Sequence, residues 1–187
     1  MTAVELPLAE KVAAIHGALD GAAISHAFGG ALALAYYAEP RATIDIDVNV
    51  FASPGQFATV MEALEPLGVA AGDAADLVER DGQCRLWWGR TPVDLFFAYD
   101  DVHEAMQEGA RRMPFGEQSL PVLSAEHLLV CKAAFDRVKD WIDIEQMLVA
   151  ADLLDVEEAD RWLIRLLGED DFRRSRFLGL ARELRPS

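Results

Sequence analysis

The residues Ile44–Val50 alternate apolar and polar side chains with a period of two, which is the spacing of a β-strand. On such a strand the isoleucines and valines share one face, and Asp45, Asp47 and Asn49 share the other. Two neighbouring aspartates repel each other unless a positive charge lies between them, and a divalent metal ion is the usual counter-charge. The pattern predicts a strand with one buried face and one metal-binding face. The alternative is an edge strand whose aspartates are simply solvated.

A glycine pair precedes this strand. The short apolar run Ile24–Phe28 predicts a strand that ends at Gly29 and Gly30, and Ala31–Ala38 has the composition of a helix that stops before Pro40. Glycines leave backbone N–H groups accessible, and a helix N-terminus favours anions. With the paired aspartates, this order predicts a site for phosphate and Mg²⁺, although a plain turn is the simpler interpretation of the glycines.

A third acidic residue lies on a later predicted strand, Val93–Ala98. Asp94 is surrounded there by apolar neighbours, and a buried carboxylate is costly without a cation or metal beside it. An exposed position at a sheet edge is the alternative.

Asp81-Gly82, between the extended segments Leu77–Arg80 and Gln83–Trp88, is a two-residue hairpin signal.

Helical patterns surround these strands, and from Ser124 onward the chain has helical patterns only. We therefore predict an α+β fold in which residues 1–123 form a small core with a mixed sheet. Residues 124–187 are expected to form a C-terminal helical bundle. The helices expected before residue 124 are Pro7–Leu19, residues 53–67 and Asp101–Ala110, with short extended pieces within residues 111–123.

The length and composition exclude some classes of protein. A chain of 187 residues is sufficient for one domain with a modest helical extension. Its apolar runs are shorter than the roughly 18 residues of a membrane span. The N-terminal residues lack the pattern of a signal peptide, so we expect a cytoplasmic protein in which Cys84 and Cys131 are reduced thiols.

The formal net charge of −15 argues against non-specific binding to nucleic acid. The charge is uneven, because residues 1–110 carry 5 basic and 17 acidic side chains, whereas residues 111–187 carry 12 basic and 15 acidic ones. A surface that binds a polyanion should therefore lie on the C-terminal part. The alternative is that these charges only decorate exposed helix faces.

Several of these residues together resemble a known signature. Gly29-Gly30-Ala-Leu followed by Arg41-Ala-Thr43-x-Asp45-x-Asp47 is similar to the motif of nucleotidyltransferases of the DNA polymerase beta superfamily. The nearest pattern is that of the AbiEii-like branch, which includes toxins of type IV toxin–antitoxin pairs and minimal nucleotidyltransferases. Asp94 stands where members keep a third carboxylate. Their helical motif of Lys, Arg-x-Lys-Asp and Asp is matched by Lys132, Arg137, Lys139, Asp140 and Asp143.

The resemblance implies an enzyme that moves a nucleoside monophosphate from an NTP to a hydroxyl or amine with the help of Mg²⁺ or Mn²⁺. Two metal ions can stabilise both the attacking and the leaving oxygens in such a transfer. Thr43 stands where related toxins carry a functional Ser or Thr, although an ordinary strand threonine is the alternative. The expected catalytic residues are Asp45, Asp47, Asp94 and Lys132, and the three aspartates are also the expected metal ligands. The expected substrate-binding groups are Gly29, Gly30, Arg41 and Thr43.

Two positions depart from the motif. Ala31 replaces a Ser or Thr, and Ala42 replaces an aromatic residue, so either the substrate is altered or activity is lost. The acceptor is left open among a tRNA 3′ end, with a toxin role and an antitoxin partner, a small molecule, and a protein hydroxyl. A non-catalytic nucleotide- or partner-binding module with the same fold, and a metal-dependent phosphohydrolase, are the alternative functions.

Overall fold

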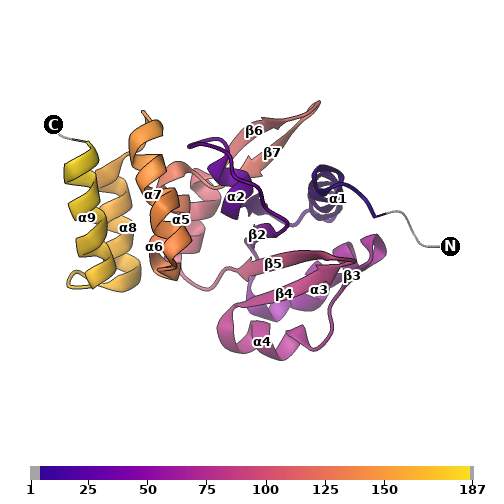
Figure 1. Ribbon diagram of the computed structural model, residues 1–187. Helices are drawn as coiled ribbons and strands as arrows, with labels where there is room; N and C mark the ends of the chain where they lie inside the picture. Colours follow the sequence, from indigo (N-terminus) through magenta and orange to yellow (C-terminus); the bar gives the residue numbers. More distant parts are fainter. Residues whose placement is uncertain (1–4, 186–187) are drawn as a thin grey trace.

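Strand β2 (Ile46–Val50) lies at the centre of a seven-stranded mixed sheet in the computed structural model, which describes residues 5–185 (Figure 1). The strand order is β3-β4-β5-β2-β1-β7-β6. Strand β2 pairs antiparallel with β1 (His26–Phe28) and parallel with β5 (Thr91–Phe97). The other strands are β3 (Val69–Ala70), β4 (Gln83–Trp88), β6 (Arg111–Phe115) and β7 (Gln118–Val122).

The alternation that predicted β2 is confirmed for most of its length. Ile46, Val48 and Val50 are at most 2% exposed and belong to the hydrophobic core. Ile44, however, was expected on the same buried face and is 70% exposed. Ile44 lies before the first residue of β2, in a segment where the Thr43 hydroxyl oxygen accepts a hydrogen bond of 3.1 Å from the Asp45 N–H in place of a strand partner.

The Asp81-Gly82 hairpin prediction is wrong. Residues Ala74–Asp81 form helix α4, and Gly82 terminates it with φ +66° and an N–H that donates to the Val78 carbonyl at 2.9 Å. A glycine with positive φ serves a helix C-terminus as well as it serves a tight hairpin. The hairpin that does form joins β4 to β5, with Gly89 (φ +62°) in its turn.

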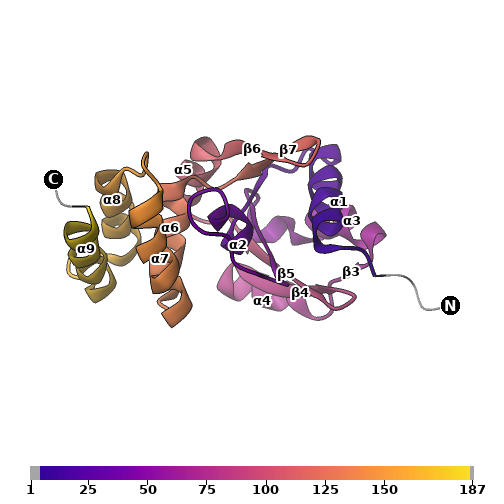
Figure 2. The same cartoon turned by 45° about the horizontal axis from the view of Figure 1, so that its top comes forward.

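Two helices pack together beside the sheet, as Figure 2 shows for α1 (Leu8–Gly21) and α3 (Phe57–Leu64). The helical segment begins as predicted at Ser53, which precedes the 3₁₀ turn η1 (Pro54–Gln56), and α3 follows this turn directly. It continues into a second 3₁₀ turn, η2 (Glu65–Leu67). Helix α2 (Gly30–Leu34) is shorter than expected, and it packs against α6.

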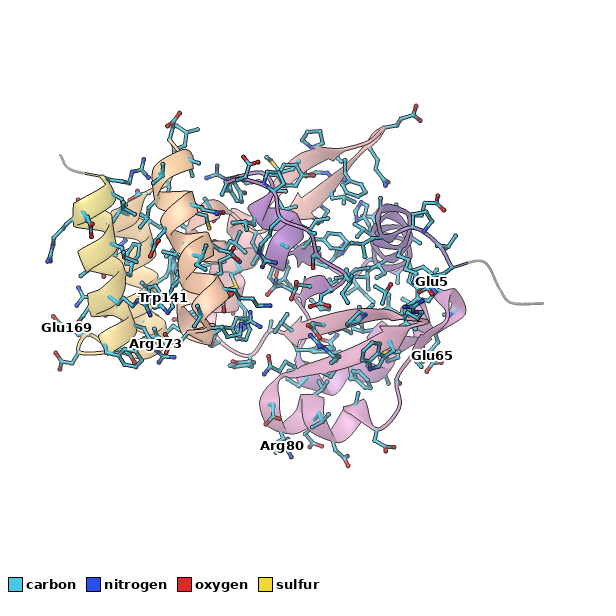
Figure 3. The ribbon with its side chains drawn as sticks, viewed as in Figure 1. Glu5, Glu65, Arg80, Trp141, Glu169 and Arg173 are labelled. Atoms are coloured by element: carbon cyan, nitrogen blue, oxygen red, sulfur yellow. The ribbon has the colours of Figure 1, made fainter. Side chains whose placement is uncertain are left out.

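The C-terminal helices lie together at the end of the molecule opposite α1 (Figure 1). Their starts follow the sequence signals, because the side chains of Ser124, Asp155 and Asp171 each accept a hydrogen bond from a first-turn N–H. Trp141, labelled in Figure 3, is 2% exposed and has the Arg176 guanidinium over its ring at 4.1 Å. These helices are α6 (Ala125–Phe135), α7 (Val138–Ala150), α8 (Val156–Leu167) and α9 (Phe172–Leu184). Helix α5 (Asp101–Gly109) precedes β6 in the chain and contacts α8.

The predicted fold class is confirmed: a mixed sheet with flanking helices is followed by helices alone. None of the helices within residues 5–185 is long and apolar enough to cross a membrane.

Candidate active site

The register between β2 and β5 brings two of the predicted carboxylates together. Asp47 is the direct partner of Asp94 in this parallel pair, so both side chains leave the sheet on the same face. Their neighbours Val48 and Leu95 leave on the opposite face, where both are fully buried. Asp94 therefore lies on the side of the sheet that the sequence analysis required.

An arginine that the sequence analysis missed joins this cluster. Arg85 in β4 lies directly across from Asp94, and its Nε and Nη2 atoms each donate to a different oxygen of that carboxylate at 2.7 Å. Its Nη2 atom also lies 3.8 Å from Oδ2 of Asp45. The three acids thus share one face, and a guanidinium lies between Asp45 and Asp94. The sequence analysis assigned no role to Arg85 within the extended segment Gln83–Trp88, because its partner depends on the strand register.

Asp47 lies against the glycine pair. A Cβ atom at Gly30 would fall 1.8 Å from the Asp47 Oδ2 atom, and Gly30 has φ +55°. Both facts require glycine there. Burial, and next the charges of Asp94 and Asp45, raise the pKa of Asp47 to about 6, although Lys132 and Arg137 partly offset this. The carboxylate of Asp47 is therefore short of positive charge.

Gly29 contributes differently from the expectation. Its N–H donates to the Asp47 carbonyl at 2.9 Å, so that N–H is already bound and is not free for a phosphate oxygen. The bond instead fastens the glycine turn to β2. Thr43 likewise bonds the backbone of Asp45, which makes its observed role the shaping of the turn before the strand.

The two predicted cations share one carboxylate. Lys132, which is 3% exposed, donates from Nζ to Asp143 Oδ2 at 2.6 Å. Arg41 donates to the two Asp143 oxygens from Nε and Nη2, at 3.1 Å each. Burial alone would raise the pKa of Asp143, but the hydrogen bonds from Arg41 and Lys132 hold it below its ordinary value. Two cations on one anion leave this cluster with a net positive charge, and Lys132 partly offsets the rise in the pKa of Asp47.

Replacing Asp143 by asparagine should destabilise the protein by about 3 kcal/mol at pH 7, because the buried Lys132 loses its counter-charge. The Asp143 pKa is depressed, so its contribution is complete above the ordinary value of 3.8 and is lost as the pH falls below it. Urea unfolding at pH 7 and pH 3 tests both statements. The exposed Asp152 is the control, and its asparagine variant should unfold like the parent. An equal loss at both pH values would contradict the ion-pair explanation.

A cavity of about 310 Å³ opens next to Asp47. Gly29, Gly30 and Lys132 line one part of it, and aromatic side chains line another. Arg137 also faces it, held by Asp140 at 2.6 Å and stacked over the Phe135 ring at 4.8 Å. The lining thus combines two cations and flat apolar surfaces with three carboxylates, Asp47, Asp81 and Asp140. Lys132 beside the glycines and the rings further along suit a ligand with both phosphates and a ring. The aromatic lining residues are Phe96, Phe97, Tyr99 and Phe135.

The predicted metal ligands fit a divalent cation by their chemistry, because hard cations prefer carboxylate oxygens. Within residues 5–185, however, no three His, Cys, Asp or Glu side chains converge closely enough to hold one as they stand. Positive charge is instead supplied to Asp45 and Asp94 by Arg85, and Asp47 remains the least compensated of the three. The three carboxylates that could bind a divalent cation are therefore present, but their oxygen atoms do not converge on one point.

The fold is similar to that of several nucleotidyltransferases. The solution structure of the antibiotic-resistance factor ANT(2'')-Ia matches with a TM-score of 0.63 and 16% identity, over 94% of this chain and 95% of that one. A crystal structure of ANT(2'')-Ia with adenylyl-2''-tobramycin matches with a TM-score of 0.56 and 17% identity, over 91% and 97%. Lincomycin-bound LnuA, a lincosamide antibiotic adenylyltransferase, matches with 0.53 and 15%, over 74% and 94%.

These matches establish a shared fold. No protein-family model matches the sequence, and the search of curated proteins also returned no match.

Proposed function

We propose that this protein is a nucleotidyltransferase that moves an NMP group from an NTP to a hydroxyl or amine acceptor with the help of Mg²⁺ or Mn²⁺. The observation that carries the proposal is the pairing of Asp47 with Asp94 across β2 and β5, next to a glycine turn and a cavity. A non-catalytic module would have no need to keep mutually repelling acids on one face. The fold shared with ANT(2'')-Ia and LnuA supports the same reaction class.

Asp45, Asp47 and Asp94 would hold the metal, which in such a transfer stabilises the charge that builds up on the phosphate oxygens. Asp94 would also accept the proton of the incoming hydroxyl, since it is the carboxylate on the neighbouring strand. Burial and the two neighbouring carboxylates raise the pKa of Asp47, and its side chain has little room to move because Gly30 lies against it. Asp47 would thus define the position of the metal, and the side chain of Asp94 would move to meet it.

The triphosphate would lie along the positively charged side of the cavity. Lys132 and Arg41 jointly exceed the charge of Asp143, and of these two cations Lys132 lines the cavity. The guanidinium of Arg137 also faces the cavity, although Asp140 balances its charge. The stacked pair of Arg137 and Phe135 offers a flat surface for the base. The closeness of Gly30 to Asp47 would bring the phosphates near the carboxylates without a side chain in between.

A small, positively charged acceptor is favoured over tRNA. The net charge of −15 attracts a polyamine and repels a polyanion. The arginines at the start of α9, which suggested a tRNA surface, are already neutralised, because Arg173 pairs with Asp171 and Arg174 pairs with Asp160. The similar structures also favour a small acceptor, because ANT(2'')-Ia is in complex with adenylyl-2''-tobramycin and LnuA is bound to lincomycin. The AbiEii-like assignment, a toxin role and an antitoxin partner remain alternatives.

The test is incubation of the full-length protein with each α-³²P-labelled NTP, Mg²⁺ or Mn²⁺, and one acceptor class at a time: aminoglycosides and lincosamides, tRNA, or total protein. We expect label on a small basic acceptor. Label on tRNA would keep the reaction class and overturn the acceptor. Formation of labelled NMP or NDP without transfer to an acceptor would indicate a hydrolase, and binding of NTP with no turnover would indicate the non-catalytic module.

A further inference from the structure

We propose that Arg85 is a positioning residue of the acidic site, which holds Asp94 while no metal is bound and must release it when a divalent cation binds. The inference rests on the proposed function, since it assigns Asp94 to the metal. It adds a residue that the motif does not contain, and it explains why the three carboxylates share a face without converging.

The geometry of the ion pair is specific. Arg85 and Asp94 are cross-strand partners in β4 and β5, and both oxygens of the carboxylate accept from the guanidinium at 2.7 Å. Such a two-bond arrangement is the strongest form of this contact and fixes the orientation of the carboxylate. Because the same guanidinium lies 3.8 Å from Asp45, it shares its charge between two acids that the proposed function assigns to a metal.

The guanidinium of Arg85 is able to move away from Asp94, whereas the side chain of Asp47 is held in place beside Gly30. The Arg85 side chain is 50% exposed, so its guanidinium can move into water without loss of hydrogen bonding. The Asp94 side chain is 16% exposed and needs a cation when the arginine departs. A doubly charged ion shared with Asp47 provides more charge than the single charge of Arg85. Replacement of the Arg85 guanidinium by a divalent metal ion is therefore the step that brings the three carboxylates together.

Calorimetric titration of Mn²⁺ into the metal-free protein tests this exchange. Arg85→Gln removes the competing cation, so we expect it to bind Mn²⁺ about tenfold more tightly than the parent. Arg85→Lys, which keeps a charge but cannot form two parallel bonds, should fall between them. Arg165→Gln is the matched control, because it removes an exposed arginine that pairs with Asp101 outside the site. Its affinity should equal that of the parent.

A direct readout comes from NMR of the parent with Mg²⁺. The Arg85 Nε–H signal, identified by its loss in Arg85→Gln, should move as Mg²⁺ is added, together with the backbone amide of Gly30 beside Asp47. A Gly30 signal that moves while the Arg85 signal stays would show that the metal binds without displacing the arginine, and the inference would be wrong.

The titration separates the inference from the proposed function. If the parent binds Mn²⁺, Asp47→Asn weakens it, and Arg85→Gln binds equally or more weakly, then Arg85 supports Asp94 rather than competing for it, and only the inference fails. If neither the parent nor Arg85→Gln binds Mn²⁺, both the metal site and the inference are overturned. Thermal unfolding of each variant confirms that the comparison is made on folded protein.

Discussion

Replacing Asp47 by asparagine should lower nucleotidyl transfer by about a thousandfold or more, because it removes the central carboxylate of the site. Asparagine has nearly the same shape, so the contact with Gly30 is kept and only the charge is lost. Initial rates with a saturating NTP and the preferred acceptor measure the effect. The control is Asp170→Asn, an exposed carboxylate beyond α8, which should retain the parent rate.

The same substitution should stabilise the metal-free protein. The pKa of Asp47 is about 6 in the folded state, above its ordinary value of 3.8, so ionisation of this group favours unfolding as the pH rises from about 4 to 6. Well above pH 6 the asparagine variant should gain about 3 kcal/mol in the free energy of unfolding. Below pH 4 the gain should vanish, because the carboxyl is then protonated in both states.

Urea unfolding in EDTA at pH 4 and pH 7.5 measures this gain. An inactive variant that is also more stable would mean that Asp47 is maintained for its chemistry at a cost to the fold. Parent-like activity in Asp47→Asn would count decisively against the proposed site. A loss of stability at pH 7.5 would mean instead that the carboxylate has a counter-charge in the fold that we have not assigned.

Replacing Gly30 by alanine should abolish transfer and destabilise the protein by about 2–4 kcal/mol. The new Cβ would lie 1.8 Å from Asp47 Oδ2 and 2.5 Å from its Cγ, so either the carboxylate or the turn must move. The backbone adds strain, because φ +55° is unfavourable for alanine. Rates and urea unfolding measure the two effects.

Gly179→Ala is the matched control for that substitution. Gly179 lies within α9, and a Cβ there would meet nothing within 4 Å. Alanine should therefore raise the free energy of unfolding by about 0.5–1 kcal/mol and leave the rate unchanged. A fully active Gly30→Ala would show that Asp47 need not lie against the glycine turn.

Much of the fold is predictable because it depends on local signals. The period of two in β2 selects its buried face whatever the neighbours are, and Ser124, Asp155 and Asp171 cap their helices with their own side chains. The Asp81-Gly82 prediction failed at the same local level. A left-handed glycine satisfies a helix end and a hairpin equally, and only the packing of α4 decides between them.

The candidate site was likewise predicted in part by local patterns and decided in part by tertiary contacts. The sequence by itself determined that Asp47 and Asp94 occur on strands and that a glycine turn precedes them, because strand periodicity and glycine geometry are properties of short segments. Asp45, also expected on the strand, lies just before β2. Strand register decided the rest. It set Asp94 beside Asp47 and Arg85 across from Asp94, and the packing of α6 and α7 gave Lys132 and Arg41 one shared carboxylate. These contacts join residues far apart in the chain, and no local pattern encodes which cation an acid meets.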